Sequence, residues 1–283
     1  MNYRHAFHAG NFADVVKHAV LVRILAYLRQ KPAPFRVIDT HAGAGRYDLA
    51  GEEAQRSGEW RDGIGRLVGG PIAARMRTLL APYLDAVAAC NVVGRLTIYP
   101  GSPALAGAFL RAQDRLIACE LEPNAAAALA RNLAGDLRTK AVAIDGWTAL
   151  KAYVPPKERR GLLLVDPAYE DAGDFARLGQ GLVAAHRKWA SGIFLGWYPI
   201  KERTAPDALA RRLRNSGIPK VLRAELSVAA PREPTRLAAC GLIVINPPWT
   251  LADELAMLLP ELAAALSGQS GGAHRLDWLA GER

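Results

Sequence analysis

The sequence FRVIDTHAGAG, at Phe35–Gly45, begins as an apolar strand and ends as a glycine turn. Short apolar runs bounded by turn residues are typical of strands buried on both faces of a sheet. Gly43 and Gly45 let the backbone pass close to a ligand, because neither residue has a Cβ. The turn lacks the full G-x-G-x-x-G spacing, which argues against a dinucleotide pyrophosphate site. We therefore predict an α/β fold with a ligand site after its first strand.

Helical and apolar segments alternate on both sides of this turn. Residues 11–30 carry apolar side chains at helical spacing, and Pro32 and Pro34 end that helix. Ser102 is predicted to be a helix N-cap, with Pro103 at the first helical position. Strands are predicted at 35–39, 115–120, 141–145, 162–166 and 193–198, with a final antiparallel pair at 220–227 and 237–246. These seven strands predict a mostly parallel sheet covered by helices on both faces.

The chain is predicted to divide into three segments. Residues 1–45 hold an N-terminal tail, a helix, the first strand and its glycine turn. Residues 46–100 form an inserted helical subdomain, and residues 101–283 form the remainder of the domain, ending in a short stretch after Gly272. A chain of 283 residues, 51% of them hydrophobic, can bury the core of one large domain with an insertion.

Charge and composition restrict the partners and the compartment. The net charge of +9 and the isoelectric point near 9.7 favour a polyanionic partner such as nucleic acid, but they say nothing about chemistry. No apolar run approaches the roughly 18 residues of a membrane-spanning helix, and the polar N-terminus does not resemble a secretory signal. The scattered cysteines, Cys90, Cys119 and Cys240, fit a reduced, cytoplasmic protein.

Acidic residues end four successive parallel strands: Asp39, Glu120, Asp145 and Asp166. In such sheets, ligands bind beyond the carboxyl ends of the strands. The acid at 120 is suited to ribose hydroxyls, and Asp145 with Gly146 is suited to an adenine edge. The four acids predict an electronegative slot for a cationic sulfonium cofactor, S-adenosylmethionine, and disfavour a phosphate ligand.

The fourth strand runs into Asp166-Pro167-Ala168-Tyr169. An exocyclic adenine amine is a poor nucleophile, because its lone pair is delocalised into the ring. The Asp166 carboxylate and the Pro167 carbonyl are two adjacent acceptors that can hold both N–H groups and turn the lone pair toward a methyl donor. Tyr169 offers a face on which the target base can stack.

A second strip, Asn246-Pro247-Pro248-Trp249, matches the amino-methyltransferase pattern [DNS]-P-P-[YFW] better than the first. It ends the last predicted strand, too late in the chain for the strand beside the glycine turn. A circularly permuted strand order would rescue it, but the four acids would then lose their common edge. We therefore prefer Asp166 as the catalytic residue and interpret the second strip as a proline turn before a helix.

The N-terminal segment is rich in histidine. His5, His8 and His18 are a candidate metal site, which the lack of cysteine or suitably spaced acids disfavours, so no metal is expected. A surface-exposed tail is one interpretation. The other is a tail that folds over cofactor and RNA, with His18 near the cofactor and Tyr3 or Lys17 near the nucleotide.

Several of these motifs resemble the RlmJ family of bacterial 23S rRNA adenine-N6 methyltransferases, which act on the adenine conventionally numbered 2030. The resemblance rests on YRHAFHAGNFADVVKH at Tyr3–His18, DTHAGAGRY at Asp39–Tyr47, YPGSP at Tyr99–Pro103 and WYP at Trp197–Pro199. It runs from the N-terminal motif to the strip at Asn246, nearly the whole chain.

The resemblance implies a Rossmann-like methyltransferase fold with a helical insertion, working as a monomer on 23S rRNA. It implies that Asp166 is the catalytic acceptor and that Tyr3 contacts RNA. The cofactor contacts that it implies are His18, His41, Ser102, Glu120, Asp145, Gly146 and Asp166. Ala168 departs from the family pattern, which has a second proline there, so loop rigidity is in question while the Pro167 carbonyl is retained.

Other functions stay open on sequence alone. The chain could be a methyltransferase fold that binds RNA without turnover, or an adenine methyltransferase that acts on DNA. A nicotinamide oxidoreductase is disfavoured by the glycine spacing and the strand-end acids. Candidate RNA-gripping residues, whose alternative is a solvated helix face, are Arg56, Arg61, Arg66, Arg211, Arg212 and Arg214.

Overall fold

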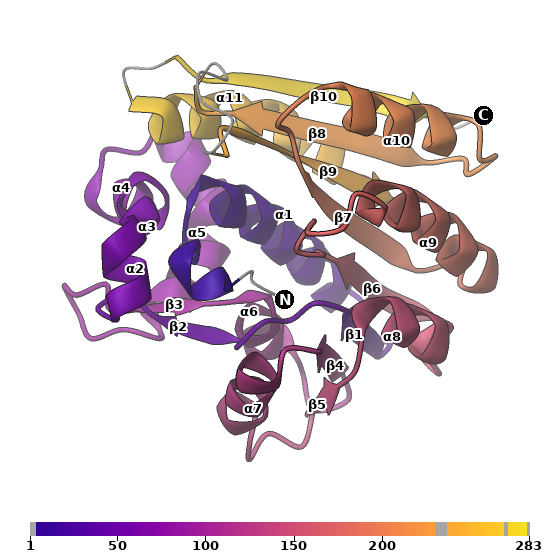
Figure 1. Cartoon of the computed structure of the whole chain (residues 1–283), viewed down its shortest axis with the longest axis horizontal. Helices are drawn as coiled ribbons and strands as arrows, with labels where there is room; N and C mark the ends of the chain where they lie inside the picture. The colour runs from indigo at the N-terminus through magenta and orange to yellow at the C-terminus, as the bar shows by residue number, and fades with distance from the viewer. Residues whose placement is uncertain (1–3, 230–236, 269–270, 282–283) are drawn as a thin grey trace.

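A twisted sheet forms the centre of the computed structural model, which describes residues 4–229, 237–268 and 271–281 (Figure 1). Within these residues the sheet has eight strands in the order β10-β8-β9-β7-β6-β1-β4-β5. The parallel strands are β1 (Phe35–Asp39), β4 (Arg115–Glu120), β5 (Thr139–Ala143), β6 (Arg160–Val165) and β7 (Ile193–Pro199). The antiparallel pairs are made by β8 (Val221–Ser227), β9 (Ala239–Ile245) and β10 (Ala273–Ala280).

The predicted fold class is confirmed, with two corrections to the strands. The sheet of the described residues has eight strands rather than seven, because the C-terminal stretch after Gly272 pairs with β8 as an additional edge strand. The third predicted strand begins and ends two residues earlier than 141–145, because Asp145 caps the following helix. Both differences concern the two edge strands of the sheet, which are only partly buried, so their hydrophobic patterning is weak.

Helices cover both faces of the sheet, as the apolar strands require. One core contains Leu162 and Leu164 of β6, and the other contains Leu163, because alternate residues of a strand face opposite sides. The helices of the first core are α1 (Phe12–Arg29), α6 (Ser102–Phe109), α7 (Pro123–Asn132) and α11 (Leu251–Ser267). Those of the second are α8 (Gly146–Tyr153), α9 (Asp174–Lys188) and α10 (Thr204–Arg214).

Residues 46–100 are described throughout and are mainly helical. They form β2 (Arg46–Asp48), α2 (Glu52–Ser57), α3 (Glu59–Asp62), α4 (Ile64–Gly69), α5 (Ala74–Ala88) and β3 (Ile98–Pro100), and β2 pairs with β3. Helix α5 packs against α1 and α11, so residues 46–100 share the core of the first face. The short 3-10 turn η1 (His5–Phe7) contacts α2. The three-segment division of the chain stays a prediction.

Two further observations concern the helices. Gly101, not Ser102, is the N-cap of α6, and Ser102 is its first residue, which frees the serine side chain for another contact. Among the described residues, no helix is both long and apolar enough to cross a membrane.

Candidate active site

The glycine turn lies across the carboxyl ends of the three central parallel strands. Strand β1 pairs with β4 on one side and β6 on the other. The turn is fastened to both neighbours, because the amide of Thr40 donates to the carbonyl of Leu164 and the amide of Ala42 donates to that of Cys119. This edge therefore gathers the residues that follow β1, β4, β5 and β6, and it is where ligands bind in such sheets.

Glu120 at the end of β4 is oriented by backbone groups. Its Oε2 accepts from the amide of Gly43 at 2.8 Å, and its Oε1 accepts from the amides of Leu121 and Glu122. A carboxylate has about four acceptor positions, so about one is left for a ligand hydroxyl. Gly43 itself needs a positive φ of 59° and has no space for a Cβ beside the Tyr47 hydroxyl.

His41 is held neutral beside Gly146. Burial lowers its pKa to about 4. The Thr40 hydroxyl donates to the carbonyl of Leu164 at 3.0 Å, so it accepts from His41 Nδ1 at 2.8 Å and leaves Nε2 as an acceptor. A Cβ at Gly146 would collide with that Nε2 and with the Thr40 carbonyl, so only glycine fits there.

Asp145 is the N-cap of α8. Its Oδ2 accepts from the amide and the hydroxyl of Thr148, both at 2.8 Å. Burial opposes ionisation, but these hydrogen bonds outweigh it and lower the pKa of Asp145 below its usual value. The residue is thus an ionised cap whose Oδ1 accepts no hydrogen bond from Thr148.

Lys17 of α1 joins two acids across the site. Its Nζ lies 2.5 Å from Asp166 Oδ2 and 2.8 Å from Asp14 Oδ1. The Lys17 and Asp14 side chains are 5% and 2% exposed, and that of Asp166 is 13% exposed. Burial works against the charged lysine, but the two carboxylates outweigh it and hold the pKa of Lys17 well above its usual value. The predicted slot of negative charge is therefore partly neutralised from within.

His18 lies next to this lysine and hydrogen-bonds to two tyrosines in series. Its Nδ1 is 2.7 Å from the Tyr99 hydroxyl, which is 2.9 Å from the Tyr83 hydroxyl. Burial lowers the pKa of His18 to about 3, so the ring is neutral. Its Nε2 is buried without a hydrogen-bond partner among the described residues, and can therefore serve a ligand.

Asp39, at the end of β1, has a comparable unpaired atom. Its Oδ2 accepts from the Ser102 hydroxyl at 2.6 Å, whereas its Oδ1 is buried with no partner in the described part of the chain. Burial raises the pKa of Asp39 to about 7, although the Ser102 hydrogen bond opposes the shift. Ser102 thus reaches the site through Asp39 and not as a helix cap.

Tyr169 lies at the side of the site toward β7. Its hydroxyl donates to the Trp197 carbonyl at 2.7 Å, and its ring lies 4.8 Å from that of Phe175 and 5.8 Å from that of Trp197. Its backbone has a φ of 54°, which a bulky residue rarely adopts. The hydroxyl is thus tied inward, and the half-buried ring is the part left to meet a ligand.

The strip at Asn246 lies at the opposite edge of the sheet. Ile245 pairs with Phe194 near the beginning of β7, whereas Asp166 follows the end of β6. Since β7 has seven residues, the two edges are roughly 20 Å apart. The side-chain amide of Asn246 donates to the carbonyls of Ala190 and Gly192, so the residue closes a turn at the strand end. This strip therefore does not meet the glycine turn.

Comparisons with known proteins identify the family of this chain. A family model described as "Ribosomal RNA large subunit methyltransferase D, RlmJ" matches residues 32–280. The chain belongs to this family. Two RlmJ-family relatives, both named ribosomal RNA large subunit methyltransferase J, match over all of both chains, at 39% identity in Escherichia coli and 37% in Haemophilus influenzae. A solved structure from Legionella pneumophila is 32% identical and has a TM-score of 0.86, covering 96% of this chain and 98% of that one.

Membership of the RlmJ family confirms the resemblance inferred from the motifs, and with the mostly parallel sheet it confirms the Rossmann-like methyltransferase fold. The contacts implied by the resemblance do not include two residues that the structure brings to this edge, Lys17 and Asp39, although the sequence placed Lys17 near the nucleotide and Asp39 among the strand-end acids. The i, i+3 spacing of Asp14 and Lys17 on one helix face was the available signal for the first. For the second it was the position at the end of β1.

The N-terminal segment is only partly described. The proposed RNA contact Tyr3 lies outside the described residues. His5 Nε2 lies 3.0 Å from Asp14 Oδ2, and His8 Nδ1 lies 3.0 Å from Glu59 Oε2, so η1 is joined to α1 and α3. Among the described residues, no three His, Cys, Asp or Glu side chains are grouped so as to hold a metal ion.

The candidate RNA-gripping arginines have different surroundings. Arg66 donates to Asp62 and to the carbonyl of Leu266, so it joins α4 to α11. Arg56 and Arg61 are exposed but lie over the rings of Phe7 and Trp60. Those in the last turn of α10 are exposed, and α10 ends at the edge opposite the glycine turn. No RNA surface follows from them directly.

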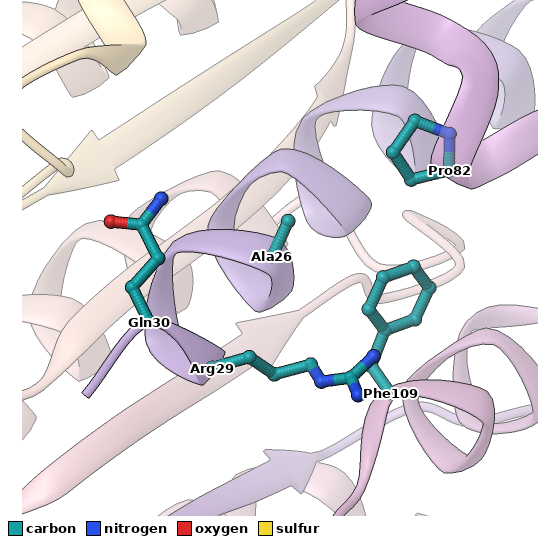
Figure 2. Close-up of a pocket in the computed structure, with 5 residues that line it drawn as sticks. All are labelled: Ala26, Arg29, Gln30, Pro82 and Phe109. Carbon is teal, nitrogen blue, oxygen red and sulfur yellow. The ribbon is translucent and has the colours of Figure 1, made fainter. Parts of the chain in front are cut away.

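A surface hollow elsewhere in the molecule is separate from this site. It lies between α1, α5 and the end of α6 and is lined by Ala26, Arg29, Gln30, Pro82 and Phe109 (Figure 2). The Arg29 guanidinium lies 5.9 Å from the centre of the Phe109 ring. Its wide-open shape and mainly apolar lining provide no convergent polar groups, so it is a weak candidate for a ligand.

Proposed function

We propose that this chain transfers a methyl group from S-adenosylmethionine to the exocyclic N6 amine of a single adenine in 23S rRNA, the one conventionally numbered 2030. We propose that it works in the cytoplasm as a monomer. The observation that carries the proposal is the position of Asp166-Pro167-Ala168-Tyr169, directly after β6 and beside the glycine turn.

Asp166 is the proposed catalytic residue. Its Oδ2 is held by Lys17, and its Oδ1 accepts no hydrogen bond among the described residues. Oδ1 and the Pro167 carbonyl can therefore take the two N–H groups of the adenine amine. Held in this way, the nitrogen lone pair points out of the base plane, where an electrophilic methyl group can meet it. The Asp166 carboxylate can take the proton after methyl transfer.

The residues at the edge fit S-adenosylmethionine, whose sulfonium supplies an electrophilic methyl group when bound. The buried, unpartnered Asp39 Oδ1 suits the cofactor's ammonium group, and the remaining acceptor position of Glu120 suits a ribose hydroxyl. The neutral ring of His41 adds no repulsion against a sulfonium. The proposed cofactor contacts are His18, His41, Ser102, Glu120, Asp145, Gly146 and Asp166, and no metal is required.

Tyr169 is the proposed surface for the target base, and Tyr3 the proposed RNA contact from the N-terminal tail. The Tyr169 ring is fixed by its hydroxyl and by Phe175, so it offers a preorganised face at little entropic cost. Ala168 replaces the family proline between the Pro167 carbonyl and this tyrosine. Because alanine does not fix its own φ, we expect the replacement to change the rate and not the reaction.

The decisive experiment incubates the protein with methyl-labelled S-adenosylmethionine and unmodified 23S rRNA and maps the labelled nucleotide. The proposal predicts label on one adenine N6, loss of labelling in Asp166→Asn, and near-normal labelling in the matched control Asn246→Ala. Binding of RNA without any labelling would favour a binding protein. Labelling of a DNA oligonucleotide instead of RNA would favour a DNA methyltransferase. Turnover that survives Asp166→Asn but not Asn246→Ala would assign the chemistry to the other strip.

A further inference from the structure

A row of three residues crosses the antiparallel half of the sheet next to the candidate site. Tyr198 of β7 pairs with Gly241 of β9, and Gly241 pairs with Glu225 of β8. Residues that are paired across neighbouring strands point to the same face of the sheet. The tyrosine hydroxyl donates to Glu225 Oε1 at 2.9 Å, so its side chain extends over the intervening strand.

Gly241 is what makes this crossing possible. A Cβ at this position would lie 2.5 Å from the Tyr198 hydroxyl oxygen and closer still to carbons of its ring. The Tyr198 side chain cannot move aside to relieve this overlap, because it is fully buried. Any side chain at 241 would therefore displace the tyrosine.

Glu225 is fixed on its other side by arginines. Arg203 donates to both of its carboxylate oxygens, at 2.8 and 3.2 Å, and Arg223 lies 3.7 Å away. Glu225 and Arg223 are buried, whereas Arg203 comes from the loop between β7 and α10 at the same edge as the glycine turn. The row thus ends in a carboxylate that has little freedom to move.

The other end of the row reaches Tyr169. The Tyr198 ring lies 6.1 Å from the ring of Phe175, which lies 4.8 Å from that of Tyr169. The Tyr169 hydroxyl is bound to the carbonyl of Trp197, the residue before Tyr198. One restraint on Tyr169 therefore comes from the end of β7, and the other comes from Phe175 of α9, whose ring packs against the Tyr198 side chain that the row holds.

We propose that Gly241 and Glu225 are positioning residues for Tyr169, acting through Tyr198 and Phe175. The role rests on the proposed function of Tyr169 as the surface for the target base. The backbone of Tyr169 has a φ of 54°, a conformation that persists only where its surroundings hold it. Gly241 of β9 and Glu225 of β8 restrain Tyr169 indirectly in this way and contact neither substrate nor cofactor.

The first test observes Tyr169 itself and requires no activity. The protein contains eight tyrosines, so 3-fluorotyrosine labelling gives a resolvable 19F spectrum in which the Tyr169 signal is identified by its loss in Tyr169→Phe. In Gly241→Ala the Tyr169 signal should shift or broaden. In Ile243→Val, which removes one methyl group from the same buried face of β9 and leaves all three residues of the row unchanged, it should stay in place. An unchanged Tyr169 signal in folded Gly241→Ala overturns the proposal.

The second test separates positioning from general destabilisation. At a temperature where all variants are folded, Gly241→Ala should lower kcat by about 10-fold or more, because a small misplacement of a reacting group is costly. The KM for rRNA should stay within about twofold, and Ile243→Val should leave both constants near normal. If Gly241→Ala does not fold, Tyr198→Phe removes only the hydroxyl and should shift the Tyr169 signal with a smaller loss of kcat. The proposal would be rejected if Ile243→Val changed the Tyr169 signal and kcat as much as Gly241→Ala does, or if Tyr198→Phe changed neither. An inactive parent protein would instead reject the proposed function.

Discussion

Replacing Lys17 by methionine should destabilise the protein strongly. Methionine keeps much of the side-chain length but removes the ammonium that lies 2.8 Å from Asp14 and 2.5 Å from Asp166. Breaking a buried ion pair from one side costs about 3–5 kcal/mol, because the remaining charge is left uncompensated. Here two carboxylates remain within roughly 5 Å of each other, and their mutual repulsion at an effective dielectric constant of about 20 is about 3 kcal/mol. We therefore expect a loss of about 3–5 kcal/mol in the free energy of unfolding at pH 8.

The loss should be smaller in acid. In the parent protein, burial opposes ionisation of Asp14, but the electrostatic influence of His5 and Lys17 holds its pKa well below the usual value. That stability is present above pH 4 and is lost only as the pH falls further. Without Lys17, repulsion raises the carboxyl pKa values, so the folded variant binds a proton that the unfolded chain does not. Its stability should then fall as the pH rises, and the difference from the parent should be larger at pH 8 than at pH 5.5 by more than about 1 kcal/mol.

Urea unfolding followed by circular dichroism at the two pH values measures both effects. Lys188→Met, which removes an exposed lysine from the last turn of α9, should change stability by less than about 0.5 kcal/mol. Adding Asp14→Asn to Lys17→Met removes one of the two facing charges and should restore part of the loss. Two results would refute the reasoning: Lys17→Met as stable as the parent at both pH values, or no recovery in the double variant.

Three further variants test other parts of the site. Burial raises the pKa of Asp39 to about 7, so between about pH 4 and pH 7 the folded protein binds a proton there that the unfolded chain does not. The free energy of unfolding should therefore fall as the pH rises through this range. Asp39→Asn should remove this pH dependence in urea titrations. Tyr99→Phe leaves the buried His18 Nδ1 without its partner and should cost about 1–3 kcal/mol in the same assay, and a loss below about 0.5 kcal/mol would contradict that hydrogen bond. Gly43→Ala places a Cβ against the Tyr47 hydroxyl at a positive φ, so calorimetry with S-adenosylhomocysteine should show affinity reduced at least about 10-fold, and unchanged affinity would place the ligand elsewhere.

Much of the central sheet could be predicted because the inner residues of its strands are mainly apolar. The strand before the glycine turn was predicted with its observed bounds, Phe35–Asp39, and so was Arg115–Glu120. The edge strand Ala273–Ala280 was missed because most of its residues are exposed or half-buried and its apolar residues do not alternate regularly with polar ones, so no periodic pattern identifies it. Ser102 was assigned to the wrong helical position because serine and proline fit both the N-cap and the first turn.

A residue of the candidate site could be predicted only where the strand that precedes it could be predicted. The residues that follow parallel strands meet at one edge of the sheet, so the four strand-end acids from Asp39 to Asp166 could be grouped from the sequence alone. Contacts between distant segments could not: Lys17 and Asp166 are separated by 149 positions, and neither has a local pattern that names the other. The same holds for Tyr198 and Glu225, which meet only because Gly241 between them has no side chain.

The two proline strips show why position in the sheet outweighs the local pattern. Both contain a residue in the left-handed region, Tyr169 with a φ of 54° and Asn246 with a φ of 51°. Asparagine adopts this conformation at little cost, and Asn246 uses its amide to close a strand end. For a tyrosine the same backbone costs about 1–3 kcal/mol, which a turn could avoid with asparagine or glycine. Retaining a costly tyrosine beside Asp166, restrained through its hydroxyl and its ring, is explained by a ring that must face a ligand. The better pattern match therefore belongs to the unstrained, structural strip, and the strained one belongs to the proposed chemistry.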